Sequence, residues 1–267
     1  MRKRVLSLLL GVCLLLPLCA CGGELLSGGV KVSAAGATPE ETVENFINAL
    51  KKQDVETMLA CCYIDEFYER LDFADYVDYL RSLAVGYSTA PTEYEYYRDL
   101  VIAERRGDFA KKIRCLTWSL LAFREEVQDY SEYADYKRLL DGVIVGPVDW
   151  VWADTFTEVI DPSLLENLEI ERLDHQKLTD KQLDASERRW IDTFGVDDWS
   201  DQIVLLDIDG SLFCKGFDLV KVNDCWKIAG LNSLFLGENS SGAATPVESV
   251  SVYKEFLEDG IPGDYDF

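Results

Sequence analysis

The sequence is poor in the residues that most often carry catalysis and metal binding. It has one histidine, His175, and no Cys-x-x-Cys pair, so a zinc site built from histidine and cysteine lacks its ligands. It has no nucleophile elbow, phosphate-binding loop or metalloprotease motif. These absences argue against the most recognisable enzyme classes, and they give no reason to expect a cofactor or a bound metal.

Basic residues are also scarce. Lys and Arg number 26 against 49 Asp and Glu, which gives a formal net charge of −23. Such an excess of negative charge argues against binding nucleic acid and against lying on anionic lipid. Hydrophobic residues make up 48% of the chain, so it is expected to fold around a core and not to form a disordered acidic tail. The acidity either serves solubility or attracts cations and cationic peptides.

Long hydrophobic runs are missing as well. The apolar stretch from Leu6 to Leu18 is shorter than the roughly 20 residues that span a bilayer as a helix. It follows three basic residues, Arg2, Lys3 and Arg4, and this order is typical of a secretory signal peptide. No later window is long and apolar enough to cross a membrane.

The end of the apolar stretch resembles the lipobox of bacterial lipoproteins. Leu18 lies three residues before the expected cleavage site, Ala20 directly before it, and Cys21 directly after it, with Cys19 as a departure from the usual pattern. The resemblance implies that residues 1–20 are removed and that lipid on Cys21 anchors the chain to the extracytoplasmic face of the cell membrane. An ordinary cleaved signal peptide with release into the medium is the alternative.

The cysteines after Cys21 are odd in number, so they cannot all pair within the chain; they are Cys61, Cys62, Cys115, Cys214 and Cys225. We expect them to act mainly as small buried apolar residues.

The N-terminal half is predicted to be helical. Residues 21–37 indicate a flexible tether, and Thr38, Pro39 and Glu41 predict a helix start with a capping box. A second helix is expected to be capped by Asp54 and to carry Val55, Met58 and Leu59, and a third is expected at about 66–83. Residues 91–141 are expected to hold three more helices. Asp108 is expected to cap the middle one, whose apolar seam would pack against its two neighbours.

The second half is predicted to form a sheet. A strand is expected at about 168–175, followed by a helix that Thr179 begins with a capping box and that ends at Gly195. Three strands are then expected at about 203–208, 213–222 and 226–231. Asp209-Gly210 and Asn223-Asp224 are turn signals between them.

Leading helices, a strand and a final three-stranded meander resemble the nuclear-transport-factor-two-like cone. The resemblance rests on residues 38–54 and on 217–228, which contain Asn223-Asp224-Cys225-Trp226-Lys227-Ile228. It implies an α+β domain at 38–236, in which helices pack on a curved antiparallel sheet. It also implies an inserted helical subdomain at about 91–164, with a linker and acidic tail at 237–267.

The same superfamily includes ketosteroid isomerase and scytalone dehydratase, whose curved sheet surrounds a pocket with acid–base residues. This makes His175 a candidate pocket residue, although a surface position or a satisfied hydrogen bond is the plainer interpretation. Asp207 and Asp209 could bind a cation, but the later ligands of a calcium loop are missing, so a solvated hairpin end is favoured.

Aromatic residues supply the other candidates. Trp150 and Trp152 lie two apart beside acidic residues, and on a strand their rings would share one face and could hold a sugar or a cationic group. Packing between the insertion and the cone is the competing interpretation. Six tyrosines could form an interaction surface or pack internally: Tyr94, Tyr96, Tyr97, Tyr130, Tyr133 and Tyr136.

The leading functional hypothesis is a non-enzymatic, membrane-anchored module that binds a small ligand or an envelope protein. An isomerase- or dehydratase-type enzyme is the first alternative, and an envelope scaffold or spacer is the second. A deep apolar pocket with one desolvated carboxylate would favour the enzyme, and a filled cone the scaffold. An exposed apolar patch on the helical insertion would favour partner binding.

Overall fold

The centre of the fold is an antiparallel sheet. The computed structural model describes residues 34–81, 94–122, 160–175, 178–231 and 242–259. A first unit, Met1–Ser33, lies outside the described residues together with Cys21, and the elements below all belong to a second unit that begins at Ala34.

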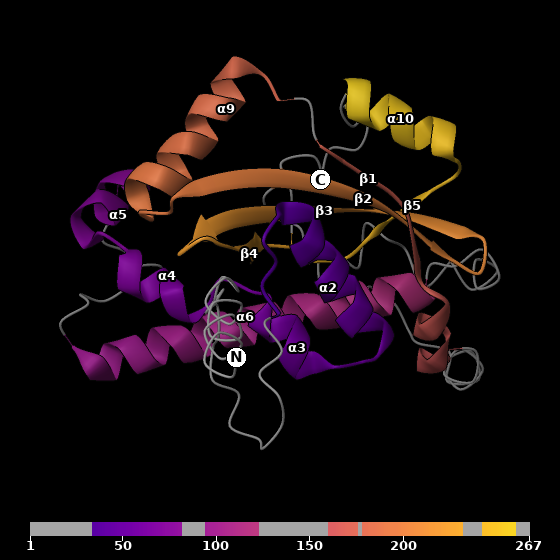
Figure 1. Ribbon diagram of the computed structural model, residues 1–267, viewed down its shortest axis with the longest axis horizontal. Helices are drawn as coiled ribbons and strands as arrows, with labels where there is room; N and C mark the ends of the chain where they lie inside the picture. Colours follow the sequence, from indigo (N-terminus) through magenta and orange to yellow (C-terminus); the bar gives the residue numbers. More distant parts are fainter. Residues whose placement is uncertain (1–33, 82–93, 123–159, 176–177, 232–241, 260–267) are drawn as a thin grey trace, which may run out of the picture. The chain divides into compact units, whose positions relative to one another are not determined.

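Four strands follow one another in the order β1-β2-β3-β4 (Figure 1): β1 (Glu169–His175), β2 (Asp198–Ile208), β3 (Ser211–Val222) and β4 (Cys225–Gly230). Both predicted turns are confirmed, because Asp209-Gly210 and Asn223-Asp224 all have positive φ, as a two-residue hairpin turn requires. β5 (Thr245–Val247) joins the sheet by pairing with residues 212–214 of β3.

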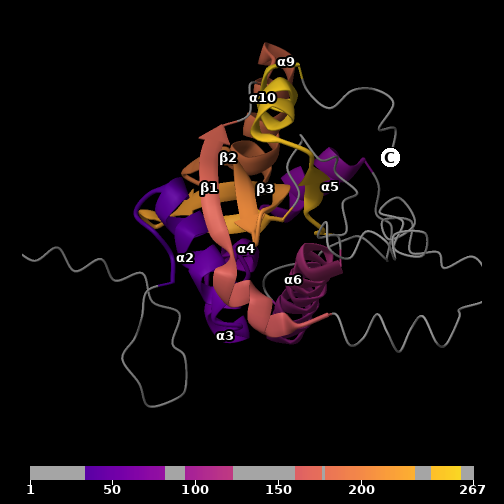
Figure 2. The same ribbon diagram turned by 90° about the vertical axis from the view of Figure 1, so that its right-hand side faces the viewer.

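Helices cover both faces of this sheet. One face carries α2 (Pro39–Lys51), α3 (Val55–Ala60) and α6 (Glu95–Ala122). The opposite face carries α9 (Asp180–Glu187) and α10 (Val250–Asp259), as Figures 1 and 2 show from two directions. The protein is therefore α+β, with helices packed on a curved antiparallel sheet, as predicted.

The first helix begins where the sequence predicted. Thr38 accepts a hydrogen bond on its hydroxyl from the backbone N–H of Glu41, at 3.2 Å. The Glu41 carboxylate accepts from the backbone N–H of Ala37, at 2.7 Å, one residue earlier than in the predicted capping box.

The single helix predicted at 66–83 is wrong. The chain forms α4 (Asp65–Arg70) and then α5 (Phe73–Leu80). Asp72 separates them, because its carboxylate accepts hydrogen bonds from the backbone N–H groups of Ala74 and Asp75, at 2.8 and 3.1 Å. A side chain that caps a new helix start competes with continuation of the previous helix.

The helix start predicted at Asp108 is also wrong, because α6 runs through Gly107 and Asp108 without a break. Asp108 pairs instead with Lys112 one turn later, at 3.0 Å. Ile102 and Phe109 both pack on the main core, so packing on either side of Gly107 keeps the helix intact. Four residues of the predicted apolar seam, Phe109, Ile113, Leu116 and Leu120, are buried in this core, and the rest of the seam lies outside the described residues.

Shorter helical elements complete the fold. A 3-10 helix, η2 (Pro162–Asn167), precedes β1, and Thr179 begins α9 with the predicted capping box. α9 then widens into a π-helical turn, η3 (Arg188–Thr193), which ends before Gly195 with its positive φ.

Part of the predicted C-terminal linker is structured. β5 lies on β3, and the backbone N–H of Ala244 donates to the Ser119 hydroxyl of α6 at 2.8 Å. Gly242 has φ +93, and a Cβ there would lie 2.7 Å from the Lys112 carbonyl oxygen. This close approach to α6 shows why a glycine stands at this point.

Candidate functional site

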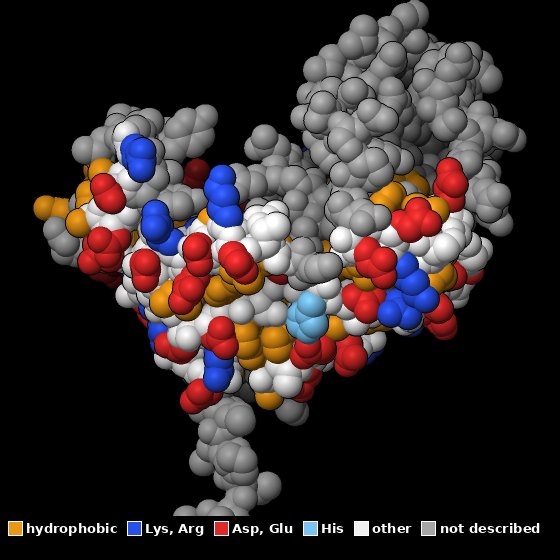
Figure 3. Space-filling model, turned by 90° about the horizontal axis from the view of Figure 1, so that it is seen from above, with side chains coloured by type: hydrophobic (Ala, Val, Ile, Leu, Met, Phe, Trp, Pro, Cys, Tyr) orange, Lys and Arg blue, Asp and Glu red, His pale blue; other side chains and the backbone are white. Residues whose placement is uncertain are grey.

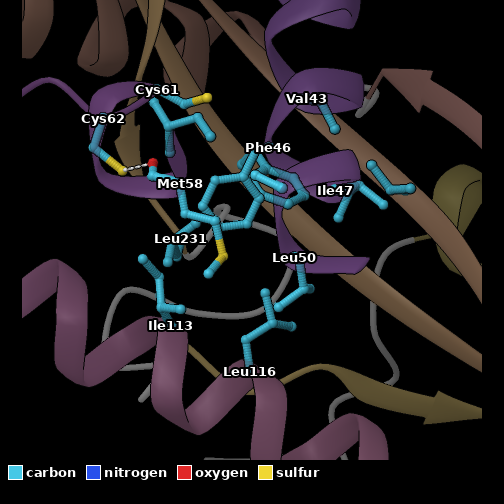
Figure 4. Close-up of a cluster of buried hydrophobic side chains, with 14 of the residues drawn as sticks. Val43, Phe46, Ile47, Leu50, Met58, Cys61, Cys62, Ile113, Leu116 and Leu231 are labelled. Carbon is cyan, nitrogen blue, oxygen red and sulfur yellow. Dashed lines mark hydrogen bonds between the residues drawn. The ribbon is translucent and has the colours of Figure 1, made fainter. Parts of the chain in front are cut away.

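The sheet face toward α2 and α6, where the cone hypothesis expected a pocket, is packed with apolar side chains. Phe46 of α2 meets Phe217 of β3 edge to face, with ring centroids 5.6 Å apart. Figure 4 shows Met58, Ile113 and Leu116 converging on the same space. In the part of the chain that the structure describes, this interior resembles a protein core and offers no acid–base pair.

Lys215 is the exception in this interior. It lies on β3 between Phe213 and Phe217, which both belong to the core, and it is fully buried. Its Nζ lies 3.5 Å from the carbonyl oxygen of Ala243. Burial, with some repulsion from Lys112, lowers the pKa of Lys215 to about 7.

The strand pairing explains how this amine is accommodated. β3 pairs with β5 up to Cys214 and with β4 from Asp218 onward, so Lys215 lies in the gap between these two partners. A buried amine with a lowered pKa can serve as a base or nucleophile, but a fully covered one cannot reach a substrate.

A polar cluster lies at the edge of the same face. His175 ends the edge strand β1, and its register partner on β2 is Gln202. Glu40, in the first turn of α2, approaches both, and Ser200 lies two residues before Gln202. Figure 3 shows the histidine, in pale blue, at the surface with acidic side chains near it.

Gln202 is the centre of this cluster. Its amide nitrogen lies 3.3 Å from Glu40 Oε1, 3.1 Å from Ser200 Oγ, and 3.0 and 3.4 Å from Nδ1 and Nε2 of His175. The residue is fully buried, whereas the side chains of His175 and Glu40 are 61% and 41% exposed. The Gln202 amide is thus buried beneath two side chains that solvent can reach, the imidazole of His175 and the carboxylate of Glu40.

The surroundings keep Glu40 ionised. Partial burial acts to raise its pKa, but hydrogen bonds from its own backbone N–H, Thr38 and Gln202, with nearby His175, lower the pKa overall. His175 Nε2 lies 3.5 Å from Glu40 Oε1, and Nδ1 lies 3.2 Å from the carbonyl oxygen of Asp201. His175 is therefore held at the rim of the sheet, where most of its side chain is exposed.

Exposed aromatic rings form a second surface at the start of α6. Tyr94, Tyr96 and Tyr97 are 56%, 70% and 46% exposed, and their rings contact one another at 5.6 to 6.1 Å. Leu100 is exposed on the next turn. We call these four residues the tyrosine surface. The other three candidate tyrosines, at positions 130, 133 and 136, and both candidate tryptophans, Trp150 and Trp152, lie outside the described residues.

The hairpin aspartates have structural roles. Asp207 accepts from the backbone N–H of Gly210 at 2.8 Å, and Asp209 accepts from the side chain of Asn167 at 3.0 Å. Within the described ranges, no three His, Cys, Asp or Glu side chains are placed to hold a metal. The plainer interpretation of these two residues, as a hairpin end, is the one that the contacts support.

Most of the described cysteines behave as core residues, and Cys225 is disulfide-bonded. Cys61, Cys62 and Cys214 are buried free thiols, and Cys115 is a partly covered one. Burial raises the pKa of Cys61 to about 12 and raises those of Cys62 and Cys214 as well. Such thiols are poor nucleophiles at neutral pH.

Sequence reasoning missed Gln202 and Lys215. The signal for both was their place in the alternation of a strand: Gln202 precedes the core residues Val204 and Leu206 at spacing two, and Lys215 lies between Phe213 and Phe217. Glu40 was assigned only to the helix start, and nothing in the local pattern connects it to positions 175 and 202.

Comparison with known proteins identifies a structural neighbour and no family. No protein-family model and no curated protein matches the chain. A cystatin-like protein from Ruminococcus gnavus ATCC 29149 superposes with a TM-score of 0.51 at 20% sequence identity, over 79% of this chain and 44% of that one. The likeness shows a shared α+β fold, and the chain spans less than half of the neighbour's length. No helix among the described residues is long and apolar enough to span a membrane.

Proposed function

We propose that this protein is a lipid-anchored extracytoplasmic module that binds a protein partner through the tyrosine surface. The observation that carries the proposal is the contrast between the two faces of the helical layer. Its inner side is packed with core residues, whereas three tyrosine rings at the start of α6 remain exposed. Tyrosine is enriched at protein interfaces because it buries a large rigid surface at small entropic cost.

The charge around the rings specifies the partner's chemistry. Glu95 and Asp99 flank the tyrosines in sequence, and Arg98 is engaged by Glu69 at 2.8 Å. Aromatic faces beside carboxylates suit lysine or arginine side chains through cation–π and ionic contacts. The net charge of −23 adds a long-range attraction for the same groups. We therefore infer a partner with a basic segment.

The anchoring part of the proposal rests on residues 1–21. A basic start, a short apolar run and Cys21 in a lipobox-like context support lipidation and cleavage before this cysteine. The order of helices and strands also supports a nuclear-transport-factor-two-like relationship. The enzymatic alternative has less support, because the buried carboxylate of the described region, Asp201, shares a strand face with Ile203, whose cluster packs against α10.

Metabolic labelling tests the anchor. The full chain, expressed in its source organism with an alkyne-tagged fatty acid, is expected to carry the label, and the Cys21→Ser variant is expected to lose it. Equal labelling of both chains, or none in the natural chain, would remove the lipoprotein proposal.

Crosslinking on intact cells tests the partner. We expect the natural chain to give a crosslink whose partner site maps to a lysine- or arginine-rich segment. The crosslink yield of the Tyr96→Ala/Tyr97→Ala variant is expected to be about ten-fold lower than that of the natural chain. Leu183→Ala, which alters an exposed apolar residue of α9, is the matched control and should retain it. A crosslink that maps to an acidic segment, or one that survives the tyrosine substitutions, would refute the proposed surface.

A further inference from the structure

Three polar atoms at the rim of the sheet form a nearly regular triangle. His175 Nε2 and Glu40 Oε1 are 3.5 Å apart, and the amide nitrogen of Gln202 lies 3.4 Å from the first and 3.3 Å from the second. The three atoms come from β1, α2 and β2, so the fold holds them together although they are far apart in sequence.

The hydrogen bonding of this cluster is incomplete. Gln202 Oε1 is buried and has no hydrogen-bond partner. Turning the amide by 180° would bring Oε1 to the position of the nitrogen, where it would face the Glu40 carboxylate at about the spacing of a hydrogen bond, acceptor against acceptor. Neither orientation satisfies all the polar atoms, and an orphaned buried acceptor is costly.

We propose that this triangle binds a divalent transition-metal ion, for which zinc is the best match, through His175 Nε2, a Glu40 carboxylate oxygen and the Gln202 amide oxygen. With the amide turned, a cation at the centre would bind the Gln202 amide oxygen and the Glu40 carboxylate, which would otherwise face each other as two acceptors. Tetrahedral zinc with ligands at about 2.0–2.1 Å places those ligands about 3.4 Å from one another. The triangle has this size without movement of the backbone.

Two side-chain rotations complete the site. The amide of Gln202 turns over, which also lets the Ser200 hydroxyl, now 3.1 Å from the amide nitrogen, donate to the amide oxygen. The imidazole turns about its Cβ–Cγ bond so that the Nε2 lone pair points to the centre, and an exposed ring has the freedom to do this. Water completes the coordination on the exposed side.

A neighbouring contact favours Nε2 as the ligand. Before the ring turns, Nδ1 of His175 lies 3.2 Å from the carbonyl oxygen of Asp201, so a small turn leaves this acceptor within reach of the Nδ1 proton. A backbone carbonyl that accepts from one ring nitrogen leaves the other free for a metal and fixes the tautomer. The partial positive charge at the start of α2 opposes a cation, but Glu40 and Glu41 lie in the same first turn and outweigh it.

This inference is independent of the tyrosine surface. It differs from the expectation of no metal site, which considered only clusters of histidine, cysteine and acidic residues. An amide oxygen as the third ligand falls outside such patterns.

Nitrogen NMR of the imidazole is the direct test, because the chain has one histidine and therefore one pair of imidazole nitrogen signals to assign. Zinc chloride is titrated into residues 22–267 that carry ¹⁵N-labelled histidine. We expect the Nε2 resonance to shift on binding while Nδ1 keeps its proton. An imidazole that does not respond to zinc at a millimolar concentration overturns the proposal.

Affinity measurements by calorimetry assign the other ligands. His175→Asn, Glu40→Gln and Gln202→Met are each expected to weaken zinc binding by about ten-fold or more. Glu41→Gln is the matched control: it removes the same charge from the same helical turn, but its carboxylate is bound to Ala37, so its effect should stay within about two-fold. A Glu41 effect as large as that of Glu40 would show diffuse electrostatic attraction and overturn the assigned ligands.

Cobalt(II) absorption separates this site from the free thiols, because a thiolate ligand gives an intense near-ultraviolet band that nitrogen and oxygen ligands do not. We expect only weak visible bands, and a thiolate band would overturn the assignment. If Gln202→Met does not fold, Gln202→Glu replaces it. An added carboxylate is expected to tighten zinc binding, and weaker binding by this folded variant would refute the role of position 202.

Discussion

Replacing Lys215 by methionine is expected to stabilise the protein at neutral pH. Lys215 is fully buried, and burial lowers its pKa from 10.5 to about 7. At pH values between these two pKa values, the amine is protonated in the unfolded chain and largely neutral in the folded one. The free energy of unfolding therefore rises with pH over this range. Methionine has a similar length, fits an apolar site and has no charge to neutralise.

The magnitude follows from the pKa difference. One pKa unit corresponds to about 1.36 kcal/mol, so at pH 7.5 the wild-type chain loses about 4 kcal/mol by neutralising this amine on folding. At pH 9.5 the same cost is about 1.4 kcal/mol. The amine has one long contact, 3.5 Å to the Ala243 carbonyl, which offsets little of this.

Urea unfolding followed by tryptophan fluorescence measures the effect. The stability advantage of Lys215→Met should be several kcal/mol at pH 7.5 and should shrink by about 2.5 kcal/mol at pH 9.5. Lys221→Met is the control, because Lys221 lies on the same strand but is partly exposed and pairs with the exposed Asp224. A Lys215→Met chain less stable than wild type at both pH values would refute the reasoning, since it would show that the buried amine makes a strong favourable interaction.

Three further predictions test the packing. Gly242→Ala is expected to lower the free energy of unfolding by about 2 kcal/mol or more, because φ is +93 and the new Cβ would meet the Lys112 backbone at 2.7 Å; no change in the urea midpoint would contradict this close approach. Phe46→Ala is expected to cost about 3–5 kcal/mol, because the ring is fully buried against Phe217, and a loss below about 1 kcal/mol would mean that this face is not a packed core. In the native protein, Ellman's reagent is expected to react first with Cys115, which is the least buried of the described thiols. Mass spectrometry of the adducts would show the order of reaction. Early labelling of the buried thiols, Cys61, Cys62 and Cys214, would contradict their burial.

Local chemistry made parts of the fold predictable. A positive φ is required at the two hairpin turns, and Asp209-Gly210 and Asn223-Asp224 are residues that adopt it. The capping box at Thr179 is likewise a short-range interaction between residues three apart. Such signals need no knowledge of the rest of the chain.

Two of the features that were predicted wrongly depend on distant contacts. Asp108 was predicted to begin a new helix, yet α6 continues because residues on both sides of Gly107 pack on the core. β5 contains Pro246 and follows a glycine-rich stretch, which is typical of a linker, and its strand form comes from pairing with β3. The propensity of a short segment is a weak prior when a sheet edge is available to pair with it.

The candidate site shows the same limit. His175 was identifiable as the one imidazole, but its neighbours Glu40 and Gln202 are separated from each other by most of the domain. Their meeting depends on where α2 crosses the sheet, which no local pattern specifies. The tyrosines of α6 were identifiable by composition, whereas their exposure follows from how α6 lies against the core.

The two proposed binding surfaces differ in how they should respond to salt. Both attract cationic groups to a chain with a net charge of −23, so both should bind more weakly as ionic strength rises. The tyrosine surface meets its partner through exposed contacts, where screening removes most of the electrostatic attraction. Direct coordination at the His175 triangle acts at about 2 Å, where salt screens little. Raising the salt concentration from about 0.05 to 0.5 M should therefore release the protein partner while zinc stays bound to the imidazole, and loss of both together would mean that simple charge attraction explains the two surfaces.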